Sequence, residues 1–397
     1  MKLCDTYCTG CGLCEQMCPV GAIKWKQDED MGHFRPFIEQ SKCIQCQKCR
    51  NICPQNSPVE KNEAFECYAA WNSDSILRKK CSSGGIATAI YHDIIEKKGY
   101  AAGTVLETDE VHFKLYHTDE EIEDFRGSKY VQPHMDSIYK DVIEKLKDDK
   151  RVVFIGLPCQ CAAMIKVAKN YRNNLLVVDL VCHGVPAEIA LHEHIQELLK
   201  RQKQSVYENE HTAIAFRDPA MAVCLSLSTE KRNIYHHGLH EDEYMHAFIT
   251  GNLFAESCYN CQYACEKRVS DLTIGDFWGV GKEIPLKNKI SRPSLVLVNT
   301  EQGKKYWQEL QRKLIIEPRM INEALQGNEQ LQHPAQKGND RENLKQIARK
   351  SDWGTAMVTI YGQLVNKNYN RRMRIETIKK FLTFIGIKKI YDIFKQR

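Results

Sequence analysis

Long apolar runs are absent from this sequence. No window approaches the ~18 uncharged apolar residues that a membrane-spanning helix requires. The first five residues, Met1–Asp5, contain no apolar stretch of the kind found in signal peptides. We therefore expect a cytoplasmic protein, in a compartment where thiols stay reduced and clustered cysteines bind metal or do redox chemistry more often than they form disulfides.

Two signatures of other protein classes are also missing. No G-x-G-x-x-G follows any predicted strand, so a Rossmann dinucleotide site is unsupported. The net charge is +5, but Val365–Arg397 holds ten Lys and Arg against two acids, which leaves −3 for the rest of the chain. Proteins that bind nucleic acid carry their positive charge across the binding domain, so we expect no nucleic-acid partner.

Cysteine, by contrast, is abundant. The chain has 397 residues and 18 cysteines, too many for chance packing and too few per length for a small disulfide scaffold. Apolar residues make up 43% and charged residues 27%, which is typical of a globular protein. The length suggests two or three domains with ample core.

Two copies of one cysteine motif lie near the start of the chain. Each copy reads C-x2-C-x2-C-x3-C and is followed by proline. Three thiolates at this spacing surround one iron–sulfur cubane, while the fourth ligates the other cluster in two-cluster ferredoxins. A zinc site is the alternative, but the spacing and the proline favour iron and sulfur. We therefore assign one [4Fe-4S] cluster to Cys8, Cys11, Cys14 and Cys53, and a second to Cys43, Cys46, Cys49 and Cys18.

This first part of the chain resembles a bacterial two-cluster ferredoxin domain. Strands are predicted over Ile23–Lys26 and Phe34–Ile38, around a turn at Asp28–Gly32. Cys4 lies outside the repeated motif, and we expect it to have no ligand role.

Two polar loops follow. Cys81–Gly85 precedes a predicted helix over Ile86–Lys97, and backbone N–H groups at such a helix start can bind an anion. A glycine-rich cap without a ligand is the alternative. The loop Arg126–Val131 offers a guanidinium, a hydroxyl, an ammonium and an aromatic ring, a set that suits a phosphate and a ring together. A solvated turn is the alternative.

The middle of the chain predicts a parallel sheet. Arg151–Gly156 and Leu175–Val181 are near-continuous apolar strands, and alternation with helices is typical of βαβ units. Cys159 and Cys182 directly follow these strands, at the sheet edge where ligands bind. An activated catalytic thiol at either position is one interpretation. We expect helices over Gln160–Lys169, Pro186–Arg201 and Asp242–Phe254, and strands over His211–Arg217, Ala222–Ser228, Asn233–His237, Asp271–Gly279 and Ser294–Asn299.

Several short sequence motifs together resemble those of one family, the beta subunit of coenzyme F420 hydrogenases and dehydrogenases. The matching motifs are Ser83–Thr88, Arg126–Val131, Gly156–Gln160, Asp179–Gly184, the pair Cys258 and Cys261, and Ile274–Gly279. The expected fold class is α+β / α/β, with a ferredoxin-like domain, an α/β flavin- and iron–sulfur-binding region and a helical C-terminus. The expected boundaries are 1–60 for the ferredoxin domain, 65–145 and 150–320 for the N- and C-terminal-like family regions, and 321–397 for a basic helical segment.

The resemblance implies a bound FAD. In the family, both polar loops belong to the flavin site, and Arg126 and Lys129 would offset the pyrophosphate charge. The flavin-contact candidates are Ser83, Gly84, Gly85, Thr88, Arg126, Ser128, Lys129 and Tyr130.

The resemblance also implies a third [4Fe-4S] cluster. The thiols that match the family pattern are Cys159, Cys182, Cys258 and Cys261. Cys265 is the next candidate ligand if one of these four does not bind. We expect Cys161 to be a packing residue. His183, beside Cys182, is a candidate proton donor or a hydrogen-bonding group that tunes the cluster; a structural histidine is the alternative.

These expectations combine into one function. Electrons from a low-potential donor, ferredoxin, would pass through [4Fe-4S] clusters to FAD and on to an organic acceptor, F420 or another. The alternative is a non-catalytic electron-input subunit of a larger redox complex.

The basic tail, Arg371–Arg397, has apolar residues at roughly helical spacing among lysines. The spacing predicts a terminal helix, and its basic face would suit contact with an anionic membrane or a partner protein. Packing on its own domain is the alternative.

Overall fold

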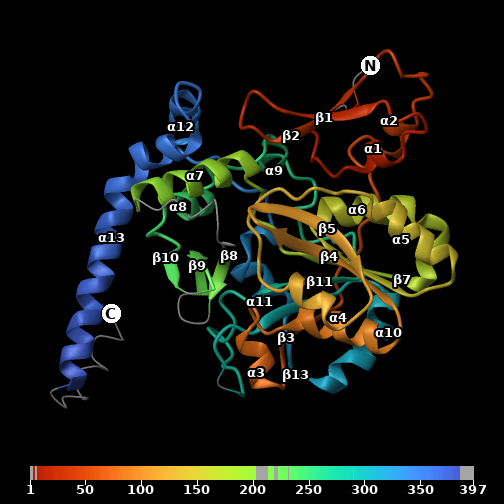
Figure 1. Ribbon diagram of the computed structural model, residues 1–397. Coiled ribbons are helices and arrows are strands. Elements are labelled where there is room, and N and C mark those ends of the chain that lie inside the picture. Colours follow the sequence, from red (N-terminus) through yellow and green to blue (C-terminus); the bar gives the residue numbers. More distant parts are fainter. Residues whose placement is uncertain are drawn as a thin grey trace.

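The architecture comes from a computed structural model (Figure 1). It describes residues 3–4, 7–202, 213–218, 222–230, 232–288 and 290–384. Within these residues, no helix is both long and apolar enough to cross a membrane.

The N-terminal part is a small ferredoxin-like unit. It contains α1 (Leu13–Gln16), the antiparallel strands β1 (Ile23–Gln27) and β2 (Phe34–Ile38), and α2 (Lys48–Ile52). The predicted turn between the strands is confirmed: the Asp28 carboxylate accepts hydrogen bonds from the backbone N–H groups of Asp30, Met31 and Gly32. Gly32 has φ +77°, and a Cβ there would lie 2.5 Å from the Ile189 side chain, so the turn fits closely against the rest of the molecule.

An eight-stranded mixed sheet forms the centre of the protein. Its order is β13-β3-β12-β11-β7-β6-β4-β5. The predicted parallel pair, β6 with β7, is confirmed, and β4 and β11 extend the parallel part on either side. The outer pairs are antiparallel. The strands are β3 (Glu66–Asn72), β4 (Tyr100–Glu107), β5 (Glu110–Tyr116), β6 (Val152–Gly156), β7 (Leu175–Leu180), β11 (Leu272–Asp276), β12 (Ser294–Val298) and β13 (Leu314–Arg319).

Helices cover both faces of this sheet, so the α/β expectation is confirmed. On the side toward the ferredoxin-like unit lie α5 (Ile138–Lys147) and α6 (Pro158–Val167); on the other lie α4 (Ile86–Glu96) and α10 (Glu301–Leu310) (Figure 1). Strands β3, β4 and β5 come from the expected 65–145 region and the other five from residues after 150, so both regions build one sheet.

A second layer of helices packs on a three-stranded sheet. That sheet has the order β10-β9-β8 and comprises β8 (Ala213–Asp218), β9 (Ala222–Ser228) and β10 (Asn233–Gly238). A separate apolar core joins it to α7, α8 and α13. The helices outside the large sheet are α3 (Ser75–Lys79), α7 (Glu188–Arg201), α8 (Glu243–Ile249), α9 (Glu256–Tyr259), α11 (Ile321–Gly327), α12 (Arg341–Ala348) and α13 (Trp353–Phe384).

Three predicted helices have different bounds in the structure. The helix predicted to reach Phe254 ends at Ile249, because Gly251 adopts φ +70° and turns the chain. The helix predicted from Gln160 begins at Pro158, where the Gln160 side chain accepts a hydrogen bond from the Leu157 N–H at 2.8 Å. The helix predicted from Pro186 begins at Glu188.

The helical C-terminus is confirmed up to Phe384. Ile375, Ile378 and Phe381 are 42%, 54% and 61% exposed, so these apolar side chains of the tail are not packed on the domain. The rest of the predicted tail, residues 385–397, and the first two residues of the strand predicted from His211 lie outside the described residues.

Candidate functional site

The ferredoxin-like unit brings thiols from both motif copies into two neighbouring groups. Left-handed glycines, Gly10 at φ +69° and Gly12 at φ +77°, shape the first loop, and the Cys8 thiol accepts a hydrogen bond from the Gly10 N–H at 3.4 Å. Burial raises the pKa of Cys49, and the neighbouring thiols of Cys18 and Cys46 raise it further.

The fourth cysteine of each motif lies with the other motif's thiols. Cys11 lies close enough to the Cys53 thiol to raise its pKa. Cys18 has the same effect on the pKa of Cys49. This proximity supports the exchange of the fourth ligand between the two sets. Cys4, expected to be a bystander, hydrogen-bonds with the Cys53 thiol, and no motif signalled that contact.

Four other thiols line one cavity at the carboxyl edge of the parallel strands. Cys159 follows β6 at the start of α6, and Cys182 follows β7. Cys258 lies in α9, with Cys261 just after it. Thus the structure brings together all four residues predicted from the family pattern.

The two other cysteines nearby behave differently. Cys265 does not line the cavity; it accepts a hydrogen bond from the Lys61 ammonium at 3.4 Å. Cys161 is fully buried, and its thiol donates to the Val178 carbonyl at 3.4 Å. Its predicted packing role agrees with this contact.

The electrostatics of the four thiols suit a metal cluster. Burial raises the pKa of Cys159 and of Cys182, and neighbouring thiols raise both further. Burial also raises the pKa of Cys258 to about 11. Buried thiols that repel one another's ionisation are stabilised as thiolates when a cation binds them together, so the donor set fits an iron–sulfur cluster.

Arg268 places a positive charge beside these four thiols. The motif analysis missed this residue. Its side chain is 2% exposed and forms an ion pair with the buried Asp179 at 3.0 Å. It also donates to the Tyr263 carbonyl at 2.9 Å, and its charge lowers the pKa of Cys261 against the larger effect of burial. The only signal in sequence was the Asp179 position inside an apolar strand.

The two loops predicted for flavin also meet. The hydroxyl of Ser82 accepts from the Ser128 N–H at 3.1 Å, which joins the glycine loop to the Arg–Tyr loop. The Ser294 hydroxyl accepts from the Gly84 N–H at 2.9 Å and lies 3.1 Å from the Ser83 hydroxyl. Gly84 has no room for a side chain, because a Cβ would lie 2.3 Å from the Ala70 carbonyl oxygen. Gly85 adopts φ +84° and begins α4, whose Thr88 hydroxyl contacts the Cys81 thiol at 3.5 Å.

The cationic side chains of the second loop are engaged within the protein. Arg126 forms an ion pair with Glu123. The Lys129 ammonium donates to the carbonyls of Asp124, Phe125 and Arg126 at 3.0–3.2 Å. Burial lowers the pKa of Lys129 to about 7. The predicted neutralisation of a pyrophosphate by these two residues therefore stays a prediction.

A polar group connects this loop to the thiol cavity. Arg217 donates to the Tyr130 hydroxyl at 2.7 Å and pairs with Asp276 at 2.5 Å. His183 lines the cavity and lies within electrostatic reach of both Arg217 and Asp276. Burial lowers the pKa of His183, so it is neutral near pH 7. Sequence reasoning missed Arg217, which lies in β8 far from any motif.

The first thiol group of the ferredoxin-like unit faces the cavity. Thr9 and Gly10 form part of the cavity wall. The Tyr139 hydroxyl donates to the Cys11 carbonyl at 2.7 Å, and the Tyr263 ring lies within electrostatic reach of Cys11, Cys53 and Cys159. Two tyrosines therefore lie between the two thiol sets.

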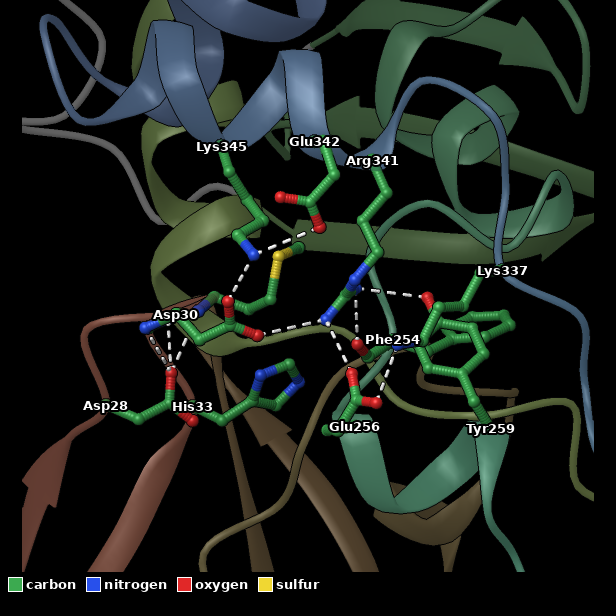
Figure 2. Close-up of polar contacts among 12 residues, drawn as sticks. Asp28, Asp30, His33, Phe254, Glu256, Tyr259, Lys337, Arg341, Glu342 and Lys345 are labelled. Atoms are coloured by element: carbon green, nitrogen blue, oxygen red, sulfur yellow. Dashed lines mark hydrogen bonds and ion pairs between the residues drawn. The ribbon is translucent and has the colours of Figure 1, made fainter.

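An ion-pair network around the buried Arg341 fixes the other end of the unit (Figure 2). Asp30, in the turn after β1, pairs with Arg341 at 3.2 Å and with Lys345, both from α12. Arg341 is 2% exposed; it donates to the Phe254 carbonyl at 2.8 Å and pairs with Glu256, two residues before Cys258. Against the effect of burial, the two cations lower the pKa of Asp30.

His33 completes this junction. Its side chain is fully buried, and its Nε2 lies 2.9 Å from the carbonyl oxygen of Val185, just past Cys182. Burial, reinforced by the charge of Arg35, lowers the pKa of His33 to about 4.

Comparison with known sequences agrees with this arrangement. Two family models describe the coenzyme F420 hydrogenase/dehydrogenase beta subunit; residues 67–140 match the one for its N-terminal part, and residues 149–324 match the one for its C-terminal part. Residues 7–57 match the family "4Fe-4S dicluster domain".

Individual relatives match about half of the chain or a shorter stretch of it. The F subunit of the F(420)H(2) dehydrogenase of Methanosarcina mazei is 25% identical over 216 residues, covering 52% of this chain and 62% of that protein, so less than two thirds of the relative is spanned. A ferredoxin-like protein in the nif region of Rhizobium leguminosarum bv. trifolii is 39% identical over 59 residues, covering 13% of this chain and 83% of that protein.

A solved structure of the F420-reducing [NiFe] hydrogenase complex from Methanosarcina barkeri contains a chain with 18% identity and a TM-score of 0.43, over 76% of this chain and 92% of that one. With the two family matches together spanning the large sheet and the thiol cavity, the chain belongs to the family of coenzyme F420 hydrogenase/dehydrogenase beta subunits and carries a 4Fe-4S ferredoxin domain.

Proposed function

We propose that this chain is an FAD- and iron–sulfur-dependent oxidoreductase that passes electrons from a low-potential donor, ferredoxin, through [4Fe-4S] clusters to FAD and on to an organic acceptor. The observation that carries the proposal is the convergence on one cavity of Cys159, Cys182, Cys258 and Cys261 with the first loop of the ferredoxin-like unit. Bound clusters would supply one-electron transfer, and a bound flavin would couple it to two-electron chemistry.

The residues divide the work between the two cofactor types. The eight motif thiols would hold two clusters, and the four cavity thiols a third. Arg268 would offset the negative charge of the third set from a position that Asp179 fixes.

The flavin part is supported by the meeting of the two polar loops. The hydroxyls of Ser82 and Ser294 accept hydrogen bonds from loop N–H groups and so hold the glycine loop in place. At Gly84 the loop backbone lies close to the backbone of Ala70, which no residue with a side chain would allow.

We assign the transfer of a proton to His183. It lies between the cavity and the Arg217–Asp276 pair, where it is neutral and able to move a proton near a reduced product.

The test is turnover by the anaerobically purified, iron-reconstituted protein. Dithionite or reduced ferredoxin serves as the electron source, and F420 and other organic oxidants as acceptors. We expect a retained flavin that is reduced by either source and reoxidised by at least one acceptor. A protein that fails to retain flavin after anaerobic purification contradicts the enzyme proposal.

A second candidate function is an electron-input component of a larger complex, with no substrate of its own. It is favoured by the relative that is named as the F subunit of a dehydrogenase. This alternative predicts reducible clusters and no turnover until a partner protein is added to the same sample.

A further inference from the structure

The two thiol groups of the ferredoxin-like unit differ in their surroundings. The loop of the first group is covered by the rest of the chain, through Tyr139 on Cys11 and through Lys166, which donates to the Ser57 carbonyl just past Cys53. Within the described part of the chain, the segment 42–48, which carries two of the four thiols of the second group, has no such cover. Among the described residues, its hydrogen bonds and ion pairs reach no further than Glu39 on one side and Asn51 on the other.

The uncovered segment is exposed and carries apolar side chains at its centre. Cys46 is exposed, and so are its neighbours from Ile44 to Lys48. Ile44 is 62% exposed, and Val20 and Phe37 on the adjoining segments are each 39% exposed. Large apolar side chains that are exposed on a small unit are typical of a contact surface.

The exposed charged side chains on these segments are mostly basic. Lys24, Lys42 and Lys48 are exposed, and Lys24 is paired across the strands with Phe37. Lys42 pairs with Glu39, the one carboxylate in the segment from residue 39 to 50. At the unit's other end the Asp30 carboxylate is already engaged inside the molecule, where it pairs with Arg341 and Lys345 (Figure 2).

We propose that the basic rim, which comprises Val20, Lys24, Phe37, Lys42, Ile44 and Lys48, is the docking surface for a small acidic one-electron carrier protein, and that electrons cross the molecular surface at the second thiol group. The proposal rests on the proposed function and adds the place and the chemistry of the partner. A small apolar centre with a ring of like charge suits a fast, transient redox encounter, which buries less area than a permanent complex. Electrons would then pass from the second thiol group to the first, because among the described residues only the loop of the first group borders the cavity of Cys159 and Cys182.

The experiment measures the binding of an acidic two-[4Fe-4S] ferredoxin to the anaerobically prepared holoprotein at low and high salt. The rim variant is the double substitution Lys42→Glu/Lys48→Glu. Its charge-matched control is Lys147→Glu/Lys150→Glu. These two exposed lysines precede β6, at the edge of the sheet opposite the thiol cavity. A second rim variant, Ile44→Asp, tests the apolar centre without touching a lysine.

We expect the wild-type protein and the control to bind with the same affinity and to lose affinity as salt rises, because salt screens the attraction. We expect Lys42→Glu/Lys48→Glu to bind about tenfold more weakly or worse, with a flatter salt dependence. Iron content and the absorbance change on dithionite addition, measured on each variant, report whether the clusters are intact. Binding that is unchanged in both rim variants, equally weakened in the control, or absent in the wild type overturns the docking proposal. Clusters that dithionite cannot reduce in the wild type contradict the proposed function instead.

Discussion

Single side chains set the electrostatics of the thiol cavity. Arg268 touches the wall of the cavity, the carboxylate of Asp179 and the backbone of the Cys261–Cys265 segment, and it is buried. A buried charge is stable only with partners, so Asp179 and Arg268 hold each other in place. The cysteines could be predicted from spacing and from the family pattern. Arg268 and Arg217 could not, because their role depends on which distant residues the fold places beside them.

The first residue-level prediction separates Cys182 from Cys265. Cys182→Ser removes one ligand from the cavity, so we expect a loss of about four iron atoms per chain with the absorbance of the other clusters kept. Cys265→Ser is the matched control, because Cys265 does not line the cavity, and it should keep its iron. Iron and acid-labile sulfide analysis of both proteins checks this. Iron loss in Cys265→Ser but not in Cys182→Ser would show that Cys265 is the true ligand.

The second residue-level prediction concerns pH. His33 has a folded pKa of about 4, whereas an unfolded histidine titrates near 6.5, so the unfolded chain binds an additional proton between these values. The stability of the protein should therefore fall as pH decreases from 6.5 toward 4 and be unaffected by His33 above 6.5. His33→Gln keeps a polar group toward Val185 and does not titrate. In this variant the loss of unfolding free energy between pH 6.5 and pH 4 should be smaller by on the order of 2–3 kcal/mol. Urea midpoints of both proteins at pH 5 and pH 7 measure it; equal slopes would rule out His33 as the source.

At the level of elements, α12 ties the ferredoxin-like unit to the segment that carries Cys258. Arg341 reaches from α12 to the turn between β1 and β2 and to the start of α9 (Figure 2). The strands, the turn and most helices could be predicted from local patterns, because periodicity and turn residues are local properties. The link through α12 could not, since it joins Asp30 to a residue 311 positions further along the chain.

This link gives a prediction with a control at the residue that follows the same helix. Arg341→Met removes a buried charge that has several partners, so we expect faster hydrogen exchange in residues 28–33 and 254–259 and a free energy of unfolding lower by about 3–5 kcal/mol. Arg349→Met removes an exposed arginine whose hydrogen bond goes to the Glu29 carbonyl, and its effect should be under about 1 kcal/mol. Equal exchange in both variants would mean that α12 does not hold the unit.

The mixed sheet shows where sequence reasoning stopped at the element level. The two apolar strands predicted a parallel pair, and the structure extends it with β4 and β11 and adds antiparallel strands at both sides. Strands such as β3 and β13 pair with neighbours that are remote in sequence, and no local pattern states that pairing. The place of Cys159 and Cys182 could still be predicted, because the carboxyl ends of parallel strands meet at one edge.

At the scale of the whole molecule, the chain has two kinds of surface on its ferredoxin-like unit. The acidic turn is bound to Arg341 and Lys345 of α12, whereas the described part of the chain does not cover the basic rim. The proposed electron path therefore begins at the basic rim, passes through the first thiol group and ends at the cavity and the two polar loops. The net charge of the sequence could not indicate it, because opposite charges at the two ends of the unit cancel in the sum.

The central claim is that one chain holds three clusters and a flavin in electrical contact. An anaerobic reductive titration with dithionite, followed by absorbance, tests it most directly. We predict an uptake of about five electrons per chain, one for each of three [4Fe-4S] clusters and two for FAD, with the flavin bands bleaching in the same titration. An uptake of two or fewer electrons, or cluster bleaching without any flavin band, would contradict the account.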